Sequence, residues 1–249
     1  VTVTANGYIK RTPLDTYRAQ KRGGKGRAGM NMREEDATTE LLVVNTHTPV
    51  LFFSSKGKVH KLKVYRLPLG AANTRGKALV NVFPLEQGET ITTFMPLPED
   101  EDQWDNMHIF FATAKGNVRR NDLSDFHDIR ANGKIAIRLD EDDDLVAVRV
   151  CNEDDNILLA AESGKSIRFP VTEVRVFKSR TSDGVRGIKL AKGDKVVSMS
   201  VLNGIECTAE ERTAYIKLAN AKRRAEGADD EETGGDAEEV VADITLSEE

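Results

Sequence analysis

The sequence predicts an all-β fold, built as a propeller-like array of about four blades. The first observation is a unit that recurs four times and opens each time at a glycine: Gly7, Gly57, Gly116 and Gly164, at spacings of 50, 59 and 48 residues. The second is that the apolar segments between these glycines are short, rich in β-branched and aromatic residues, and bounded by Gly, Asn, Asp and Ser, which favours strands. The third is the period itself, because repeated units of this length bury their faces against one another in propellers and related arrays.

Each unit keeps three types of side chain at fixed distances from its glycine. The fourth residue after the glycine is basic: Arg11, Lys61, Arg120 and Arg168. The seventh is aliphatic and the tenth is large and apolar: Leu14, Val64, Leu123 and Val171, then Tyr17, Leu67, Phe126 and Val174. The apolar positions predict a core role, including for Tyr17. Four basic residues at one repeat position predict a ring of positive charge around the array.

Four strands are expected in each unit. A short strand follows the first glycine, and a polar loop then leads to a second glycine turn: Lys25-Gly26, Arg75-Gly76, Asn132-Gly133 and Arg186-Gly187. We expect a strand after that turn, for example over residues 79–82 or 135–137. Two further apolar runs are expected to form a hairpin, 41–44 with 50–53 or 145–148 with 157–160. Four strands in about 50 residues are typical of a propeller blade.

Two acidic clusters are expected to be solvated hairpin tips. The long spacing of 59 residues arises from residues 96–107, which hold Glu99, Asp100, Glu101, Asp102 and the only tryptophan, Trp104. The second cluster covers residues 141–144. Neither has the spaced oxygen ligands and glycine of a calcium loop. The four histidines (His47, His60, His108 and His127) share no ligand spacing, so no metal site is predicted.

The pattern changes near residue 203. Residues 195–201 predict a strand that would open a fifth unit, but no partner strand follows. Thr208 and Glu211 instead form a capping-box pattern, which predicts a helix over about residues 209–225, with Gly227 past its end. Residues 227–249 are acidic and predicted to be disordered. We therefore expect a domain over 1–203 and an insertion or tail over 204–249. The chain begins without Met, so we also expect it to be a piece of a longer protein with further blades outside it.

Charge divides between these two parts. The whole chain has a formal net charge of −5, of which residues 1–200 contribute +4 and residues 201–249 contribute −9. A mildly basic body favours an anionic partner. No apolar run is long enough for a transmembrane helix and no secretory leader is visible, so no membrane partner is predicted.

One heptapeptide points to the nature of that partner. Gln20-Lys21-Arg22-Gly23-Gly24-Lys25-Gly26 packs three cations and three glycines into seven residues. Glycines allow the backbone to approach a phosphate chain closely, the cations release counterions, and Gln20 can donate to phosphate or sugar. The segment, called the box below, indicates binding to a nucleic-acid backbone without base reading. A solvated flexible loop is the alternative, whereas a nucleotide P-loop is excluded by the pattern.

The box resembles the signature box of the DNA gyrase A C-terminal domain family. The family form begins Gln-Arg-Arg, so Lys21 is a departure that keeps the charge. Residues 6–14, 42–47, 53–57 and 181–189 also resemble this family, and the resemblance extends over residues 1 to about 203.

This resemblance implies a β-pinwheel, a propeller-like disc whose neighbouring blades exchange strands and whose basic rim wraps double-stranded DNA. It implies a cytoplasmic, nucleoid-associated enzyme of two A and two B subunits that supercoils DNA negatively with ATP and Mg. The catalytic Tyr and the ATPase site belong to other parts of that enzyme, so no catalytic residue, cofactor or metal is expected in this chain. The expected DNA-binding residues are Gln20, Lys21, Arg22, Gly23, Gly24, Lys25, Gly26, Arg11, Lys61, Arg120, Arg168, Lys58, Arg119 and Lys165.

Two other functions are considered. The C-terminal domain of topoisomerase IV is similar but has a degenerate or missing box, so the intact box favours gyrase. A propeller-like scaffold for protein interactions would predict partners whose binding is insensitive to salt. A stand-alone enzyme finds no support, because the sequence shows no nucleophile–base pair, metal cluster or phosphate loop.

Overall fold

The computed structural model describes residues 1–17, 36–179, 182, 184–205 and 207–225. It divides into two compact units, Val1–Gly204 and Ile205–Glu249. The first consists of strands and short 3₁₀ turns, and the described part of the second contains one helix, α1 (Ala209–Ala225). The all-β prediction for the body of the chain is confirmed.

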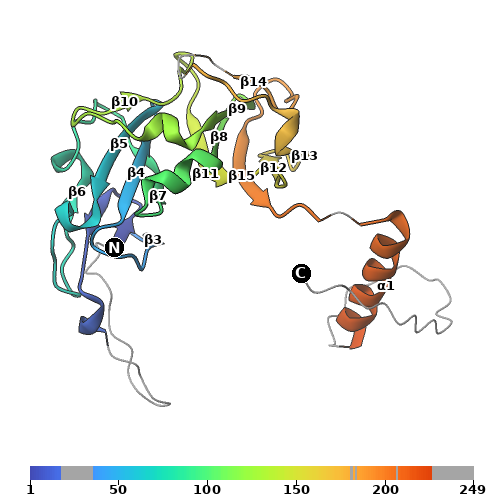
Figure 1. Ribbon diagram of the computed structural model, residues 1–249, viewed down its shortest axis with the longest axis horizontal. Coiled ribbons are helices and arrows are strands. Elements are labelled where there is room, and N and C mark those ends of the chain that lie inside the picture. The colour runs from blue at the N-terminus through green and yellow to red at the C-terminus, as the bar shows by residue number, and fades with distance from the viewer. Residues whose placement is uncertain (18–35, 180–181, 183, 206, 226–249) are drawn as a thin grey trace. The chain divides into compact units, whose positions relative to one another are not determined.

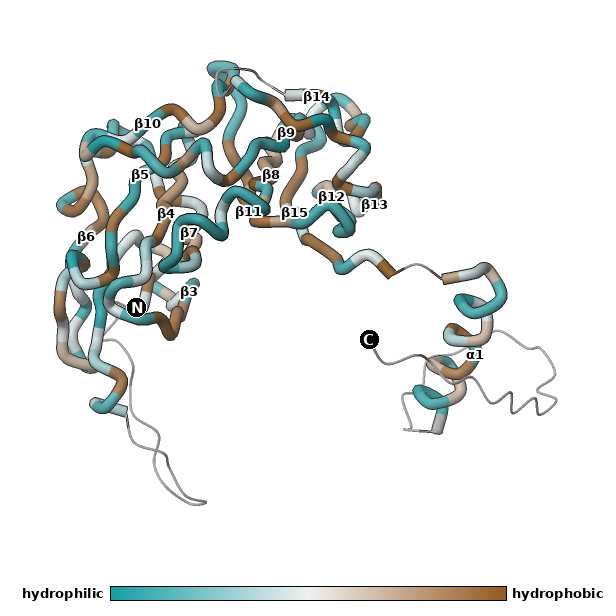
Figure 2. Tube along the Cα trace, viewed as in Figure 1, coloured by the Kyte–Doolittle hydropathy of each residue, from teal (hydrophilic) through white to brown (hydrophobic). Residues whose placement is uncertain are grey.

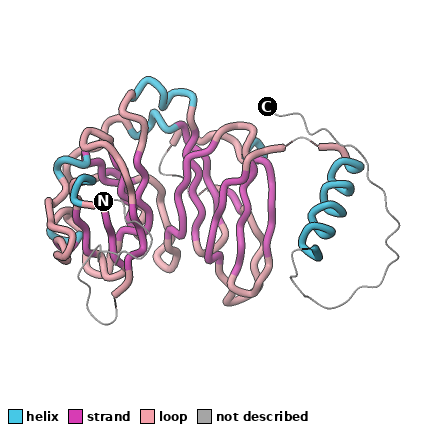
Figure 3. The backbone as a smooth tube through the Cα atoms, turned by 90° about the horizontal axis from the view of Figure 1, so that it is seen from below, coloured by secondary structure: helices cyan, strands magenta, loops and turns pink. Residues whose placement is uncertain are grey.

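The described residues of the first unit form four antiparallel sheets (Figure 1). Their strand orders are β3-β1-β2-β6, β10-β5-β4-β7, β11-β8-β9-β14 and β13-β12-β15. The strands in the first two sheets are β1 (Thr2–Thr4), β2 (Tyr8–Lys10), β3 (Thr38–Leu41), β4 (Pro49–Ser54), β5 (Lys58–Lys63), β6 (Lys77–Ala78), β7 (Ile91–Pro96) and β10 (Lys134–Ile135). Those in the other two are β8 (His108–Thr113), β9 (Asn117–Asp122), β11 (Leu145–Cys151), β12 (Asn156–Ala161), β13 (Ser166–Pro170), β14 (Val185–Arg186) and β15 (Val196–Leu202). Figure 3 shows successive sheets standing side by side.

The repeat glycines lie in the turns of four equivalent hairpins, β1–β2, β4–β5, β8–β9 and β12–β13. All four have positive φ, from +75° at Gly57 to +84° at Gly116. Each turn is closed by a bond from the glycine N–H to the carbonyl three residues earlier, such as Gly57 to Ser54 at 3.0 Å. The predicted unit is therefore confirmed, with its glycine at the centre of a hairpin.

The predicted pairing of neighbouring apolar runs is wrong. Residues 41–44 and 50–53 do not form a hairpin, because β3 belongs to the first sheet and β4 to the second. In the same way, β11 belongs to the third sheet and β12 to the fourth. The chain leaves each sheet along one strand and enters the next sheet along the following one. Consecutive apolar runs therefore belong to neighbouring sheets instead of pairing within one sheet.

The strand after the second glycine pairs with the sheet of the preceding repeat. β6 pairs with β2, β10 with β5 and β14 with β9. This exchange agrees with the expectation for a β-pinwheel. Each exchanged strand has only two residues, so the expected strand over 79–82 is wrong: that segment begins with a 3₁₀ turn, η3 (Leu79–Asn81). In the fourth repeat the positive φ belongs to Gly184, at +90°, and Arg186, predicted in the turn, lies in β14.

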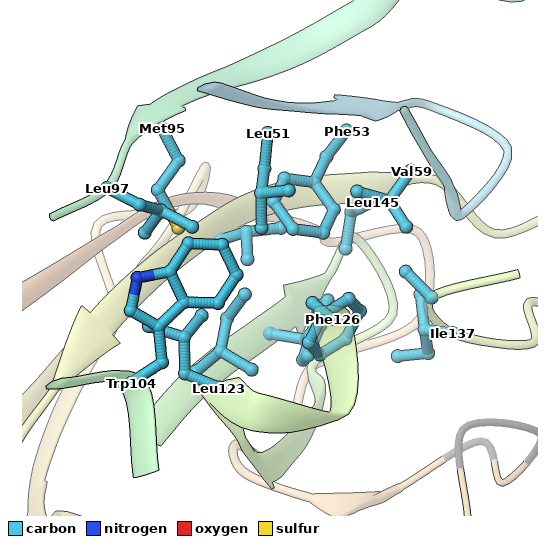
Figure 4. Close-up of a cluster of buried hydrophobic side chains, with 14 residues drawn as sticks. Leu51, Phe53, Val59, Met95, Leu97, Trp104, Leu123, Phe126, Ile137 and Leu145 are labelled. Carbon is cyan, nitrogen blue, oxygen red and sulfur yellow. The ribbon is translucent and has the colours of Figure 1, made fainter. Parts of the chain in front are cut away.

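Three hydrophobic clusters fill the junctions between consecutive sheets. Val3, Ile9, Val50 and Phe52 belong to the first cluster, which joins sheets one and two. The second joins sheets two and three, where Trp104, Leu123 and Phe126 face Leu51, Phe53 and Met95 (Figure 4). The third joins sheets three and four, around Phe110, Ile157 and Leu159. In Figure 2, β4 and β8 are largely hydrophobic, whereas the turns between strands are largely hydrophilic.

The repeated apolar positions are buried in three repeats out of four. Leu67, Phe126 and Val174 are at most 4% exposed, whereas Tyr17 is 37% exposed and Leu14 is 65% exposed. The predicted core role of Tyr17 is therefore wrong. In repeats two to four these residues, together with the 3₁₀ turns η2 (Val64–Arg66), η5 (Leu123–Phe126) and η6 (Val171–Glu173), pack against a neighbouring sheet. Around η1 (Leu14–Thr16) no such sheet lies among the described residues.

The strand at the end of the first unit and the acidic loop at residues 96–107 both differ from the expectation. The segment at 195–201 does not open a fifth unit, because β15 pairs with β12 along its whole length and completes the three-stranded sheet. The acidic loop is not only a solvated tip, because it forms η4 (Glu101–Asn106) and Trp104 is fully buried.

The capping box predicted for the helix is confirmed. The Thr208 N–H donates to Glu211 Oε2 at 2.8 Å, and the Glu211 N–H donates to Thr208 Oγ1 at 3.2 Å. The acidic segment that follows the helix lies outside the described residues. None of the helices in the described part of the chain is long and apolar enough to cross a membrane.

Candidate nucleic-acid interface

The seven box residues, Gln20 to Gly26, lie outside the described part of the chain. Their role therefore stays a prediction. The remaining seven predicted DNA-binding residues are all described, and the structure separates them into buried, paired and exposed groups.

The repeated basic position joins consecutive repeats instead of forming an exposed ring. Arg11 Nε donates to the carbonyl of Leu67 at 2.9 Å, and Lys61 Nζ donates to the carbonyl of His127 at 3.0 Å. Both acceptors belong to the next repeat. Arg120 is only 5% exposed, and its own carbonyl accepts from the Phe177 N–H at 2.7 Å. Arg168 in β13 is exposed. The prediction of an exposed ring of charge is thus wrong for Arg120, which is buried. Arg11 and Lys61 instead hydrogen-bond to carbonyls of the next repeat.

Lys61 is held by the acidic loop of its own repeat and by His127 of the third repeat. Its ammonium lies 2.5 Å from Glu101 Oε1 and 4.6 Å from the centre of the Trp104 ring. The His127 ring stands edge-on to the same indole at 4.9 Å, and the indole N–H donates to the Pro98 carbonyl at 3.1 Å. The acidic loop at residues 96–107 therefore holds Lys61 of β5 in place, and we call this arrangement the clamp.

The three neighbouring cations also differ from one another. Arg119 is fully buried, so its predicted place on the surface is wrong. Lys58 is half-buried and lies 2.5 Å from Glu86, whose hydrogen bond raises the pKa of this lysine. Lys165 is exposed, and its ammonium donates to the Lys189 carbonyl at 3.0 Å.

The exchanged strands carry cations that the sequence did not single out. β6, β10 and β14 form one edge of the first three sheets, whereas β11 contacts both β7 and β15 near the opposite edge. Figure 1 shows the exchanged strands on the outside of the arc of blades. We call β6, β10 and β14 the outer edge. Its cations are Lys77, Lys134 and Arg186, of which Lys77 and Arg186 are exposed.

A sequence signal for these cations exists. Each lies one or two residues after a glycine with positive φ: Gly76, Gly133 or Gly184. The Lys134 ammonium also donates to the Asp128 carbonyl at 2.9 Å. The box glycine Gly26 was assigned to the same kind of turn in the first repeat, so the box is the sequence counterpart of the segments that lead into the outer edge.

Acidic residues at a second repeat position fasten the hairpin turns. The carboxylates of Asp36, Asp143 and Asp194 accept the N–H of the residue just before a repeat glycine: Asn6 at 3.0 Å, Lys115 at 2.9 Å and Ser163 at 3.1 Å. The Ser163 hydroxyl also donates to Asp194 and lowers the pKa of that carboxyl. Asp143 is only 4% exposed, so the acidic turn at 141–144 is more than a solvated tip. Within the described residues, no three His, Cys, Asp or Glu side chains gather as a metal site requires.

The profile of a family described as "DNA gyrase C-terminal domain, beta-propeller" matches residues 1–45, 48–98, 108–152 and 155–203. The chain belongs to this family. The four matched segments each contain one of the repeat glycines, and together they cover the four sheets. The gyrase C-terminal domain fold and its blades are therefore shown for residues 1–203.

A sequence relative and two solved structures agree with this assignment. The DNA gyrase A protein of Rickettsia bellii is 57% identical over 254 residues, an alignment covering all of this chain and 28% of that protein. A structure of a topoisomerase IV C-terminal domain has a TM-score of 0.69 at 27% identity, covering 82% of this chain and 60% of the other. A structure of a DNA gyrase A C-terminal domain has a TM-score of 0.60 at 26% identity, covering 80% and 63%.

These comparisons favour gyrase over topoisomerase IV. The two structural matches have similar sequence identities, so the 57% identity to a gyrase A protein decides between them. The chain spans about a quarter of that relative's length, 28%, so the gyrase C-terminal domain is one part of a longer chain in such relatives.

Proposed function

We propose that this domain binds double-stranded DNA along its outer edge and bends the duplex around the blades. The observation that carries the proposal is the placement of Lys77, Lys134 and Arg186 on equivalent exchanged strands of three successive sheets. Cations repeated along a curved edge neutralise successive phosphates and release counterions. The box adds Lys21, Arg22 and Lys25 in the segment just before the corresponding glycine of the first repeat, Gly26.

The proposed binding has little sequence preference. Among the described residues, the first unit offers no recognition helix for the major groove, and its outer-edge cations stand on two-residue strands. Contacts of this kind position a protein on the phosphate backbone without reading bases. In a competition between unrelated duplexes at fixed salt, we expect affinities to agree within about 2 kcal/mol, the scale of one or two specific base contacts. A larger preference would contradict backbone binding.

The whole protein is proposed to be the gyrase A chain of an ATP-dependent type II topoisomerase that contains two A and two B subunits. In this proposal the chain contributes DNA binding and wrapping, whereas the catalytic tyrosine and the site for ATP and Mg lie in other parts of the enzyme. A cytoplasmic, nucleoid-associated location follows from the same proposal.

The salt dependence of DNA binding tests the outer edge directly. Changing both Lys77 and Arg186 to alanine should flatten the slope of log K against log salt by about 1.8, at about 0.9 for each phosphate contact. Arg149→Ala is the matched control, because Arg149 is exposed but lies on β11, away from the outer edge. Equal slopes for the double variant and the control would contradict the proposed path.

Wrapping requires a separate measurement of topology. Relaxed plasmid incubated with the domain and religated should retain supercoils. Neutralising Lys21, Arg22 and Lys25 together should abolish this change and flatten the salt slope by about 2.7, with the fold unchanged because loop substitutions usually have little effect on stability. An unchanged slope would place the box away from the DNA.

A further inference from the structure

A buried cation of one repeat holds the segment that leads into the outer-edge strand of the next. Lys10 is the third residue after Gly7 and is fully buried. Its ammonium donates to the carbonyls of Ala71, Ala72 and Thr74, each at 2.8 Å. These acceptors belong to the second repeat and lie just before Gly76 and β6. All three donors of the ammonium are used on this one segment.

The same segment is also held at its two ends. At its start, the N–H of Arg11 donates to the Pro68 carbonyl at 2.9 Å, and the N–H of Gly70 donates to the Arg11 carbonyl at 3.0 Å. At its end, β6 pairs with β2 through only two residues, Lys77 and Ala78. The conformational entropy lost when one backbone residue is ordered is at least as large as the net gain from one hydrogen bond. Two paired residues therefore do not fix the strand unaided, and the three bonds to Lys10 supply a further restraint from inside the molecule.

The third repeat has the same arrangement with a different cation. Arg119 is the third residue after Gly116 and is fully buried. Its guanidinium donates to the Ser182 carbonyl at 2.7 Å and to the Ala136 carbonyl, and it lies 5.1 Å from the centre of the Phe111 ring. Ser182 precedes Gly184 and β14, the strand that carries Arg186.

The second repeat has a histidine in this place. His60 is 2% exposed and packs against Phe83, with ring centres 5.0 Å apart. Neither of its ring nitrogens has a hydrogen-bond partner among the described residues. The next repeat passes close to it, because a Cβ on Gly133 would lie 2.6 Å from His60 Cε1. The segment leading into β10 therefore touches His60 without being bonded to it.

We propose that the third residue after the repeat glycine is a positioning residue for the DNA-binding edge. Lys10 holds Lys77 in place and Arg119 holds Arg186, whereas His60 makes no hydrogen bond to the segment that leads into the strand of Lys134. This inference rests on the proposed function, because it assigns a role to residues that never touch DNA. Without the hydrogen bonds from Lys10, Lys77 keeps its charge but loses its fixed position. DNA binding must then order the strand, which costs conformational entropy.

The experiment uses the full chain with four variants: Lys10→Met, Lys10→Arg, Lys77→Ala and the double variant Lys10→Met with Lys77→Ala. The slope of log K against log salt should fall by about 0.9 for Lys77→Ala. It should fall by a similar amount for Lys10→Met, although Lys77 is intact, and the double variant should match the singles. Lys10→Arg should restore the slope, because arginine fills the equivalent place in the third repeat.

The outcomes separate the two proposals. No effect of Lys77→Ala would overturn the edge contact of the proposed function. An effect of Lys77→Ala with none of Lys10→Met would overturn only the positioning role.

Hydrogen exchange of the unaltered chain tests the inference even if Lys10→Met does not fold. The backbone amides of residues 69–78 should exchange about tenfold more slowly than those of residues 128–135, because local opening must break the bonds to Lys10. Equal exchange in the two segments would overturn the positioning role.

Discussion

The effect of replacing Trp104, in the acidic loop at residues 96–107, on the free energy of unfolding can be worked out from its burial. Trp104 is fully buried in the cluster between the second and third sheets, and its indole N–H donates to Pro98. A buried tryptophan removes roughly 200 Å² from water, which at about 25 cal/mol per Å² corresponds to about 5 kcal/mol. Alanine retains a small part of this burial. Trp104→Ala should therefore lower the free energy of unfolding by about 4 kcal/mol, within the range measured for such changes.

Urea unfolding followed by far-ultraviolet circular dichroism measures this change. With a slope of about 2 kcal/mol per M, the midpoint should fall by about 2 M. Trp104→Phe is the matched control, since it keeps a ring in the cluster and loses the N–H donor. That control should lose less than half as much stability. A loss below about 1 kcal/mol for the alanine variant, typical of surface positions, would show that the segment is a solvated tip after all.

Three further predictions concern pH, backbone conformation and charge. Burial lowers the pKa of His60, so stability is complete above its ordinary pKa of about 6.5 and falls as the pH drops below it. The midpoint of urea unfolding should show this fall, and His60→Leu should reduce it, whereas an unchanged pH dependence would contradict the assignment. Gly76→Ala should lower the free energy of unfolding more than Gly88→Ala in the same assay. Both glycines have positive φ, but of the two only Gly76 would bring a Cβ against a carbonyl, that of Ile9 at 2.4 Å. Equal losses of stability would contradict the importance of this close approach. Deleting residues 228–249 should tighten DNA binding several-fold at low salt and much less near physiological salt, where the Debye length is about 8 Å. Equal affinities across a salt series would indicate a solubilising linker.

The repeat could be predicted because it depends on local chemistry. A glycine with positive φ is required at each hairpin turn, and the Gly7 and Gly57 turns satisfy this within a few residues of sequence. The capping box of Thr208 and Glu211 is also local, since its bonds span three residues. Both predictions were correct because they depend only on residues close together in the sequence.

The role of each basic residue could not be predicted, because it depends on which segment passes over it. Arg120 and Arg168 are both the fourth residue after their repeat glycine. Arg120 is 5% exposed, because residues 176–177 of the next repeat lie against it, whereas Arg168 is exposed on β13, which is the edge of its sheet among the described residues. Burial by a segment about 60 residues away leaves no mark in the local sequence.

The sequence by itself determined the number of units and the repeat glycine of each, because these follow from backbone conformation and hydrophobic patterning within each unit. Tertiary structure alone decided which strands pair, which cations are buried and which lie on the outer edge. The physical reason is that strand exchange brings Gly76 to Ile9 and Gly184 to Val118. These contacts join separate units, and no periodicity inside one unit encodes them.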